Sequence, residues 1–101
     1  MGSAYWTGCM ALKGSQTAEA RLNAAYQKLM ATLKNDYESE RKKLIAAQRT
    51  WIKYRQEYCE VEGEIKGGAR EWQSTYTTEC RADLASGRAT ELEKLHKSRF
   101  E

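Results

Sequence analysis

The residue types that most often carry catalytic chemistry are sparse in this sequence of 101 residues. His96 is the only histidine, and Asp36 and Asp83 are the only aspartates. No nucleophile, base and acid can be assembled from them, and the many glutamates are those expected of a helix-forming sequence. His96 has no neighbour at a metal-ligand spacing. We therefore expect no catalytic residue, no metal site and no cofactor, and we interpret the chain as a non-enzyme.

Three cysteines, Cys9, Cys59 and Cys80, are the remaining reactive groups. None belongs to a Cys-x-x-Cys pair, which disfavours a zinc or thioredoxin-type site. An odd number allows at most one internal bridge and leaves one thiol over. Spacing alone leaves two interpretations equally open, namely three reduced cysteines in a cytosolic bundle or one bridge in an exported protein.

Glutamates gather just before a glycine-rich segment, residues 63–68, which we expect to be a loop because glycines end helices. The simpler interpretation of this region is a polar turn. The alternative is a recognition loop on a rigid scaffold, where binding residues tend to lie. The candidate partner-binding loop consists of Glu60, Glu62, Glu64, Lys66 and Arg70.

The elements that must position these residues are predicted to be helices. The sequence has no proline and no alternating run typical of strands, and Glu, Lys, Ala, Leu and Arg dominate it. Apolar residues recur at helical spacing in three stretches. We expect an all-α, antiparallel three-helix bundle, a helical hairpin plus a third helix. The expected helices are about Thr17–Lys34, Tyr37–Val61 and Ala69–Lys97.

The ends of the predicted domain follow from the same pattern. Residues 17–97 should form one helical domain. Residues 1–16 are expected to be a loose or partly helical lead-in, and Met1-Gly2-Ser3 is typical of the remnant of an expression tag. Asn35 followed by Glu38 resembles a capping box, which would start the second helix.

Composition limits the classes of function. The net charge is +3 with the two signs interspersed, which is unlike the basic stripe of a nucleic-acid-binding protein. The mean hydropathy is −0.83, and no stretch approaches the ~18 apolar residues of a membrane span. We expect neither a nucleic-acid partner nor a transmembrane segment.

The second predicted helix carries polar residues in line with apolar ones. Its stripe consists of Leu44, Gln48, Trp51, Arg55 and Tyr58. Because polar side chains on a core face are usually satisfied internally, Gln48 and Arg55 should bond to groups on a neighbouring helix.

An ordered set of motifs resembles the LprI-type family of lysozyme-inhibitor-like proteins. The set spans most of the chain, from Cys9 to Leu95, and reads Leu22-Asn23-x-x-Tyr26, Gln48-Arg49-Thr50-Trp51-Ile52-x-x-Arg55, Cys59, Gly67-Gly68, Cys80 and Arg88-x-x-x-Leu92. Relatives usually have two cysteines ahead of the Leu-Asn motif, where this chain has only Cys9. The acidic residue three before that motif is commonly Asp and is Glu19 here, which keeps the charge.

A helical hairpin that turns near residues 36–37 places motif residues level when their numbers sum to about 73. Arg55 then lies level with Glu19, and Gln48 lies within reach of Asn23 and Tyr26. Arg88 should arrive near Gln48 from the third helix. The predicted network, which we interpret as structural rather than as a pocket, consists of Glu19, Asn23, Tyr26, Gln48, Trp51, Arg55 and Arg88.

The resemblance also implies a disulfide. The family has one cysteine pair ahead of the Leu-Asn motif and another around the Gly-Gly segment, and only the second pair, Cys59 and Cys80, is complete here. Cys9 should then be left free, and Cys9–Cys59 is the rival pairing. A turn centred near residue 66 would place Cys59 about 10 Å from the level of Cys80. The pairing therefore requires the chain after Cys59 to be looped or the third helix to start late.

Two functions follow from the resemblance. Family members are typically exported bacterial proteins or lipoproteins, and the namesake is associated with lysozyme inhibition. The first hypothesis is a periplasmic or secreted module that occludes a lysozyme-type glycan hydrolase. The second is a structural or interaction module of the cell envelope with no inhibitory activity. The sequence leaves the oligomeric state open.

Overall fold

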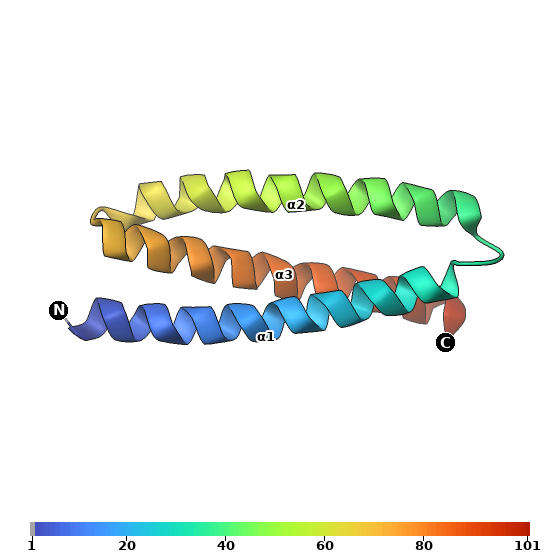
Figure 1. Cartoon of the computed structure of the whole chain (residues 1–101), viewed down its shortest axis with the longest axis horizontal. Helices are drawn as coiled ribbons and strands as arrows, with labels where there is room; N and C mark the ends of the chain where they lie inside the picture. Colours follow the sequence, from blue (N-terminus) through green and yellow to red (C-terminus); the bar gives the residue numbers. More distant parts are fainter. Residues whose placement is uncertain (1) are drawn as a thin grey trace.

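A computed structural model describes the backbone of residues 2–101 and the side chains of residues 13–101 (Figure 1). The described chain forms three long helices without a strand: α1 (Gly2–Thr32), α2 (Glu38–Gly67) and α3 (Arg70–Phe100). They run up, down and up, so α2 is antiparallel to both of the other helices while α1 and α3 are parallel (Figure 1). The result is a rod of 54 × 21 × 16 Å. The predicted all-α three-helix bundle is confirmed.

The first helix is longer than predicted. It begins at Gly2 rather than at Thr17, so residues 2–16, expected to be a loose or partly helical lead-in, are helical. Gly14 lies inside the helix, and a Cβ at this position would have nothing within 4 Å. A single interior glycine costs only about 1 kcal/mol relative to alanine, which is too little to end a helix among good helix formers.

The predicted loop over residues 63–68 is wrong. The second helix continues through Gly67, and only Gly68 and Ala69 connect it to α3. Gly68 has a φ of +69°, a conformation that favours glycine, and this is the residue that ends the helix. Gly63 and Gly67 have another use, because a Cβ at either position would collide with the backbone of Gln73 in α3. They let the two helices approach closely.

The connection between α1 and α2 does not use the predicted capping box. Tyr37, and not Asn35, precedes the helix, and it makes no side-chain capping hydrogen bond. Arg41 acts at the neighbouring helix end instead, where its Nε donates to the Met30 carbonyl oxygen at 3.4 Å. This contact satisfies one of the last carbonyls of α1, which have no partner within the helix.

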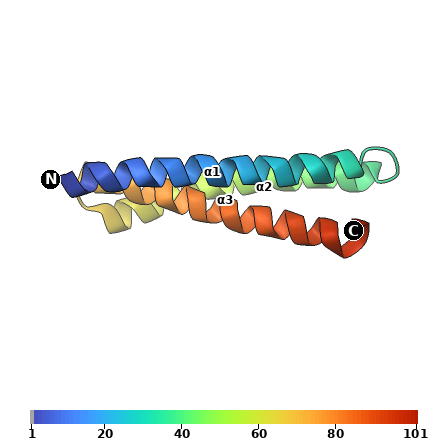
Figure 2. The ribbon, with the colours of Figure 1, turned by 90° about the horizontal axis from the view of Figure 1, so that it is seen from below.

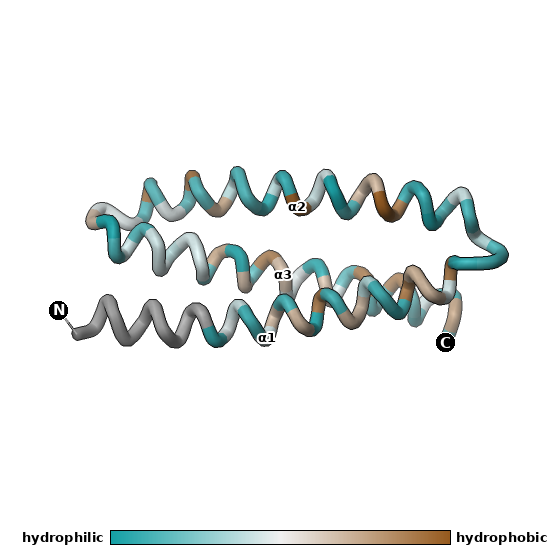
Figure 3. The backbone as a smooth tube through the Cα atoms, viewed as in Figure 1, coloured by the Kyte–Doolittle hydropathy of each residue, from teal (hydrophilic) through white to brown (hydrophobic). Residues whose placement is uncertain are grey.

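The apolar core lies between α1 and α3. It contains Leu22, Leu29 and Leu33 from α1, and Ala85, Ala89 and Leu92 from α3. The two alanines are fully buried, so the two helices can approach closely there. The view from below shows that α3 runs at an angle to α1 and separates from it toward the C-terminus (Figure 2). The buried residues of α2 are different in kind, namely Gln48, Arg55, Cys59 and Gly63. This helix is mostly hydrophilic, with scattered apolar positions (Figure 3). It joins the bundle through polar and covalent contacts and through the partly buried Leu44 and Trp51, which pack against the core.

Candidate functional site

A polar network joins all three helices near the middle of the rod. Arg55 of α2 forms an ion pair with Glu19 of α1, and Arg88 of α3 donates from Nε to Oε1 of Gln48 at 2.9 Å. The indole of Trp51 lies beside both cations, with its ring centroid 4.7 Å from Cζ of Arg55 and 6.0 Å from Cζ of Arg88. Gln48 and Arg55 are each only 8% exposed. The structure thus brings together five of the seven residues expected in the network.

Asn23 and Tyr26 are placed differently from the prediction. No hydrogen bond joins Asn23 to Gln48 within the described residues, and the Gln48 carbonyl oxygen accepts from Arg88. Asn23 is exposed, and with Tyr26, Gln48 and Ile52 it lines a shallow groove of about 430 Å³ between α1 and α2. Asn23 therefore faces solvent, and Tyr26 is partly buried against the apolar core rather than placed in the network.

The charged residues expected in a recognition loop lie on helices. Glu60, Glu62 and Glu64 occupy the last turns of α2, and Arg70 is the first residue of α3. Glu62 forms an ion pair with Lys66 one turn later, and this hydrogen bond raises the pKa of Lys66. Because the connection is only Gly68 and Ala69, these charges have fixed positions at one end of the rod.

A disulfide joins Cys59 to Cys80, with Cα atoms 5.4 Å apart, and this prediction is confirmed. The route differs from the one expected, because the chain after Cys59 is helical. The turn lies at residues 68–69 instead of near residue 66. A hairpin centred there places Cys59 level with residue 78, which brings it within about 3 Å of Cys80 along the helix axis. The side chain of Cys9 lies outside the described residues.

His96 is buried at the opposite end of the rod. Its Nε2 lies 3.0 Å from the Thr32 hydroxyl, and its Nδ1 lies 2.6 Å from the Glu101 carboxylate. The Thr32 hydroxyl also lies 3.0 Å from the Lys28 carbonyl oxygen, to which it donates. The ring of His96 is therefore held at both nitrogens, by a residue of α1 and by the last residue of the chain. The hydrogen bond from His96, and a second one from Lys28, lower the pKa of Glu101.

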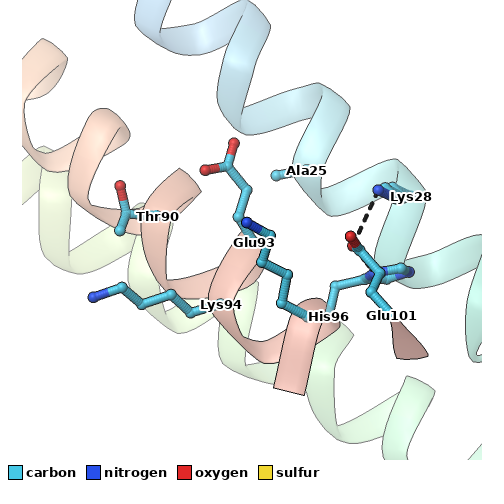
Figure 4. Close-up of a pocket in the computed structure, with 8 residues that line it drawn as sticks. Ala25, Lys28, Thr90, Glu93, Lys94, His96 and Glu101 are labelled. Atoms are coloured by element: carbon cyan, nitrogen blue, oxygen red, sulfur yellow. Dashed lines mark hydrogen bonds and ion pairs between the residues drawn. The ribbon is translucent and has the colours of Figure 1, made fainter. Parts of the chain in front are cut away.

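The surroundings of His96 form an open pocket of about 460 Å³ between α1 and α3 (Figure 4). Its acidic residues are engaged, since Glu101 binds Lys28 and Glu93 binds Arg21 at 2.7 Å. Hydrogen bonding to Arg21 lowers the pKa of Glu93. Through the contacts of His96 with Thr32, of Glu101 with Lys28 and of Glu93 with Arg21, this cluster ties the end of α3 to α1.

Comparison with known proteins identifies the family. The profile of the family described as lysozyme inhibitor LprI matches residues 5–92. The chain belongs to the LprI family. An uncharacterised protein of Rhizobium meliloti (strain 1021) is 32% identical over 94 residues, which cover 82% of this chain and 66% of that protein. No solved structure matches the chain significantly.

The matched segment includes parts of all three helices. Glu19, the Gln-Arg-x-Trp-x-x-x-Arg segment, both bridged cysteines and Arg88 all lie within residues 5–92. None of the helices in the described part of the chain is long and apolar enough to cross a membrane.

One surface of this LprI-family chain was not expected. Tyr58 was assigned to the core stripe of the second helix, but its side chain is about half exposed. Tyr54, Val61 and Ile65 are also exposed, and they share a helical spacing of three or four residues with Tyr58. The signal was present in the sequence as a second apolar stripe on the same helix, one that the polar motif obscured.

Proposed function

We propose that this chain is an exported binding module that inhibits a lysozyme-type glycan hydrolase by occluding its cleft. The observation that carries the proposal is the match to the LprI family over residues 5–92. Export is supported by the Cys59–Cys80 disulfide, because such bridges persist in oxidising compartments. A rigid rod 21 × 16 Å in cross-section suits an inhibitor that acts by blocking access.

Charge indicates which end of the rod would meet the enzyme. Lysozymes are commonly cationic, so the net charge of +3 opposes long-range approach. The glutamates at the end of α2 reverse the charge locally and could orient a cationic partner. The proposed contact residues are Glu60, Glu62, Glu64, Lys66 and Arg70.

The second candidate is an interaction module of the cell envelope without inhibitory activity. The observation that favours it is the same net charge of +3, which would slow association with a cationic hydrolase. The two functions share the fold, the export and the disulfide, and they differ in whether any lysozyme is inhibited.

Turbidity assays of cell-wall lysis separate the two functions. The oxidised protein is titrated against purified lysozymes of several classes. Inhibition of at least one class supports the proposal, and no inhibition of any class favours the envelope module.

A charge variant tests the proposed end of the rod. Glu60/Glu62/Glu64 triple alanine should weaken binding at least tenfold at low salt. Glu38/Glu40 double alanine, which removes exposed charges from the other end of α2, should leave binding unchanged. Equal affinity of the triple variant and the parent would place the contact elsewhere.

A further inference from the structure

Four apolar side chains form an exposed stripe along the second half of α2. The α2 stripe consists of Tyr54, Tyr58, Val61 and Ile65, which are 51%, 47%, 50% and 79% exposed. Their spacing of four, three and four residues places them on one face of the helix. Among residues 13–101 only six large apolar side chains are exposed to this degree, and four of them share this face. Scattered apolar residues are ordinary on a surface, but clustered ones mark interaction sites.

The backbone that carries the α2 stripe is fixed against α3 on the opposite face of the helix. The disulfide at Cys59 and the close approach at Gly63 both fix this half of α2 against α3. The rings of Tyr54 and Tyr58 stack with centroids 5.6 Å apart and planes 18° apart. A surface that is ordered before binding loses less conformational entropy when a partner arrives.

A shallow depression lies beside the α2 stripe. Tyr58, Val61 and Ile65, together with the Glu62–Lys66 ion pair, line a shallow depression of about 280 Å³. Exposed tyrosines beside such depressions are the side chains that most often dominate binding energy in protein interfaces. The depression could accept one or two apolar side chains of a partner.

Acidic residues border the stripe. Glu57 lies one helical turn from Tyr54 and from Val61, and Glu64 lies one turn beyond Val61. None of the ion pairs formed by the described side chains uses Glu57, Glu60 or Glu64. The stretch 54–65 contains four glutamates and one arginine, so its net charge is −3, whereas the rest of the chain is +6.

The acidic residues that border the α2 stripe argue against a second copy of this chain as its binding partner. In an antiparallel pair centred on the stripe, Glu57 of one copy would lie level with Glu62 of the other. In a parallel pair each glutamate would face its own equivalent. Like charges placed together across an interface are unfavourable. The same glutamates would repel an anionic membrane surface.

We propose that the α2 stripe is a docking surface for a basic protein partner, one that presents apolar side chains bracketed by lysine or arginine. The proposal deepens the function proposed above, on which it rests for the identity of a natural partner. It adds an apolar centre, the α2 stripe, to the charged contact proposed at the end of α2, and the acidic residues border that centre.

Two probes test the surface by calorimetry. One is a cationic lysozyme of the chicken type, and the other is a designed amphipathic helix of leucine and lysine. A matched peptide with glutamate in place of lysine should not bind. Tyr58→Gln/Val61→Gln should weaken binding of the basic peptide at least tenfold. Leu95→Gln, at an equally exposed residue of α3, should change it less than twofold. Glu57→Gln/Glu64→Gln should weaken binding and reduce its salt dependence.

Circular dichroism and urea midpoints confirm that each variant is folded, which is expected because the substituted side chains are half exposed. The proposal is overturned if neither basic probe binds, if the acidic peptide binds equally, or if Leu95→Gln matches the stripe variant. Stripe-dependent dimerisation in sedimentation would assign the surface to a second copy and would also overturn it.

The outcomes separate this proposal from the proposed function. If the basic peptide binds through the stripe but no lysozyme is inhibited, the surface stands and the inhibitor function fails. If a lysozyme is inhibited equally by the parent and by Tyr58→Gln/Val61→Gln, the inhibitor function stands and the surface fails.

Discussion

Alanine at Gly63 should destabilise the bundle, whereas alanine at Gly87 should stabilise it. Both glycines lie inside long helices, Gly63 in α2 and Gly87 in α3. A Cβ at Gly87 would have nothing within 4 Å. A Cβ at Gly63 would lie 2.8 Å from the Gln73 carbonyl oxygen and would also collide with the Thr77 hydroxyl. The same substitution therefore meets a crowded site at Gly63 and open space at Gly87.

The expected magnitudes follow from these contacts. At Gly87 the substitution should raise the free energy of unfolding by about 0.5–1 kcal/mol, the intrinsic advantage of alanine in a helix. At Gly63 this gain is offset by overpacking, which typically costs ~1–3 kcal/mol. The Thr77 hydroxyl could rotate away, but it would lose its hydrogen bond to Gln73, worth about 1 kcal/mol. A net loss of roughly 1–2 kcal/mol is expected for Gly63→Ala.

Urea unfolding followed by far-ultraviolet circular dichroism measures both variants, with the disulfide intact in each. Gly63→Ala should have the lower midpoint and Gly87→Ala the higher, relative to the parent. If both variants were stabilised to the same extent, α2 and α3 would not approach closely at Gly63, and the account of the helix pair would be wrong.

Three further measurements test other contacts. Cys59→Ser/Cys80→Ser should lower the free energy of unfolding by about 3 kcal/mol, the chain-entropy value for a separation of 21 residues, and an unchanged midpoint would contradict this. Arg55→Ala should cost about 1–3 kcal/mol, less than the ~3–5 kcal/mol of a fully buried pair, since Glu19 is 35% exposed and stays hydrated. Because the folded-state pKa of Glu101 lies below the unfolded value of about 4.3, its stabilisation is present above that pH and should be lost as pH falls through the lower value. Acid titration of Glu101→Gln should then show a smaller loss of stability than the parent.

The helices and one cross-helix register could be predicted because they depend on local periodicity and equal rise. A hairpin turning near residues 36–37 placed Arg55 level with Glu19, and the structure pairs them. The glycines could not be sorted by the same means. Gly68 has positive φ, whereas Gly63 and Gly67 are helical and serve close packing. The sequence shows where a glycine stands. It does not show whether that glycine is needed for a positive φ or for the close approach of two helices.

The polar network shows a second limit. Gln48 was expected to bond to Asn23 of the first helix, and it accepts from Arg88 of the third. Periodicity gives the face of each helix but not the competition between two neighbours for one acceptor. The exposure of Tyr58 has the same origin, because Trp51 and Arg55 turn the α2 core face toward the network and leave Tyr58 at its edge.

The unequal links among the helices divide the chain into two folding units. The disulfide closes α2 and α3 into a hairpin of adjacent segments, whereas the described side chains of α1 join α3 through non-covalent contacts between residues about 70 apart, such as Arg21 with Glu93. The hairpin can close early because its helices are adjacent in the sequence. Docking of α1 onto α3 comes later, because it requires closure of a much longer loop. Detachment of α1 leaves the crosslink intact and exposes Ala85, Ala89 and Leu92. Amide hydrogens of α1 should therefore exchange through a partial opening that spares those around Cys59, and this state is also the one most open to proteases and to aggregation.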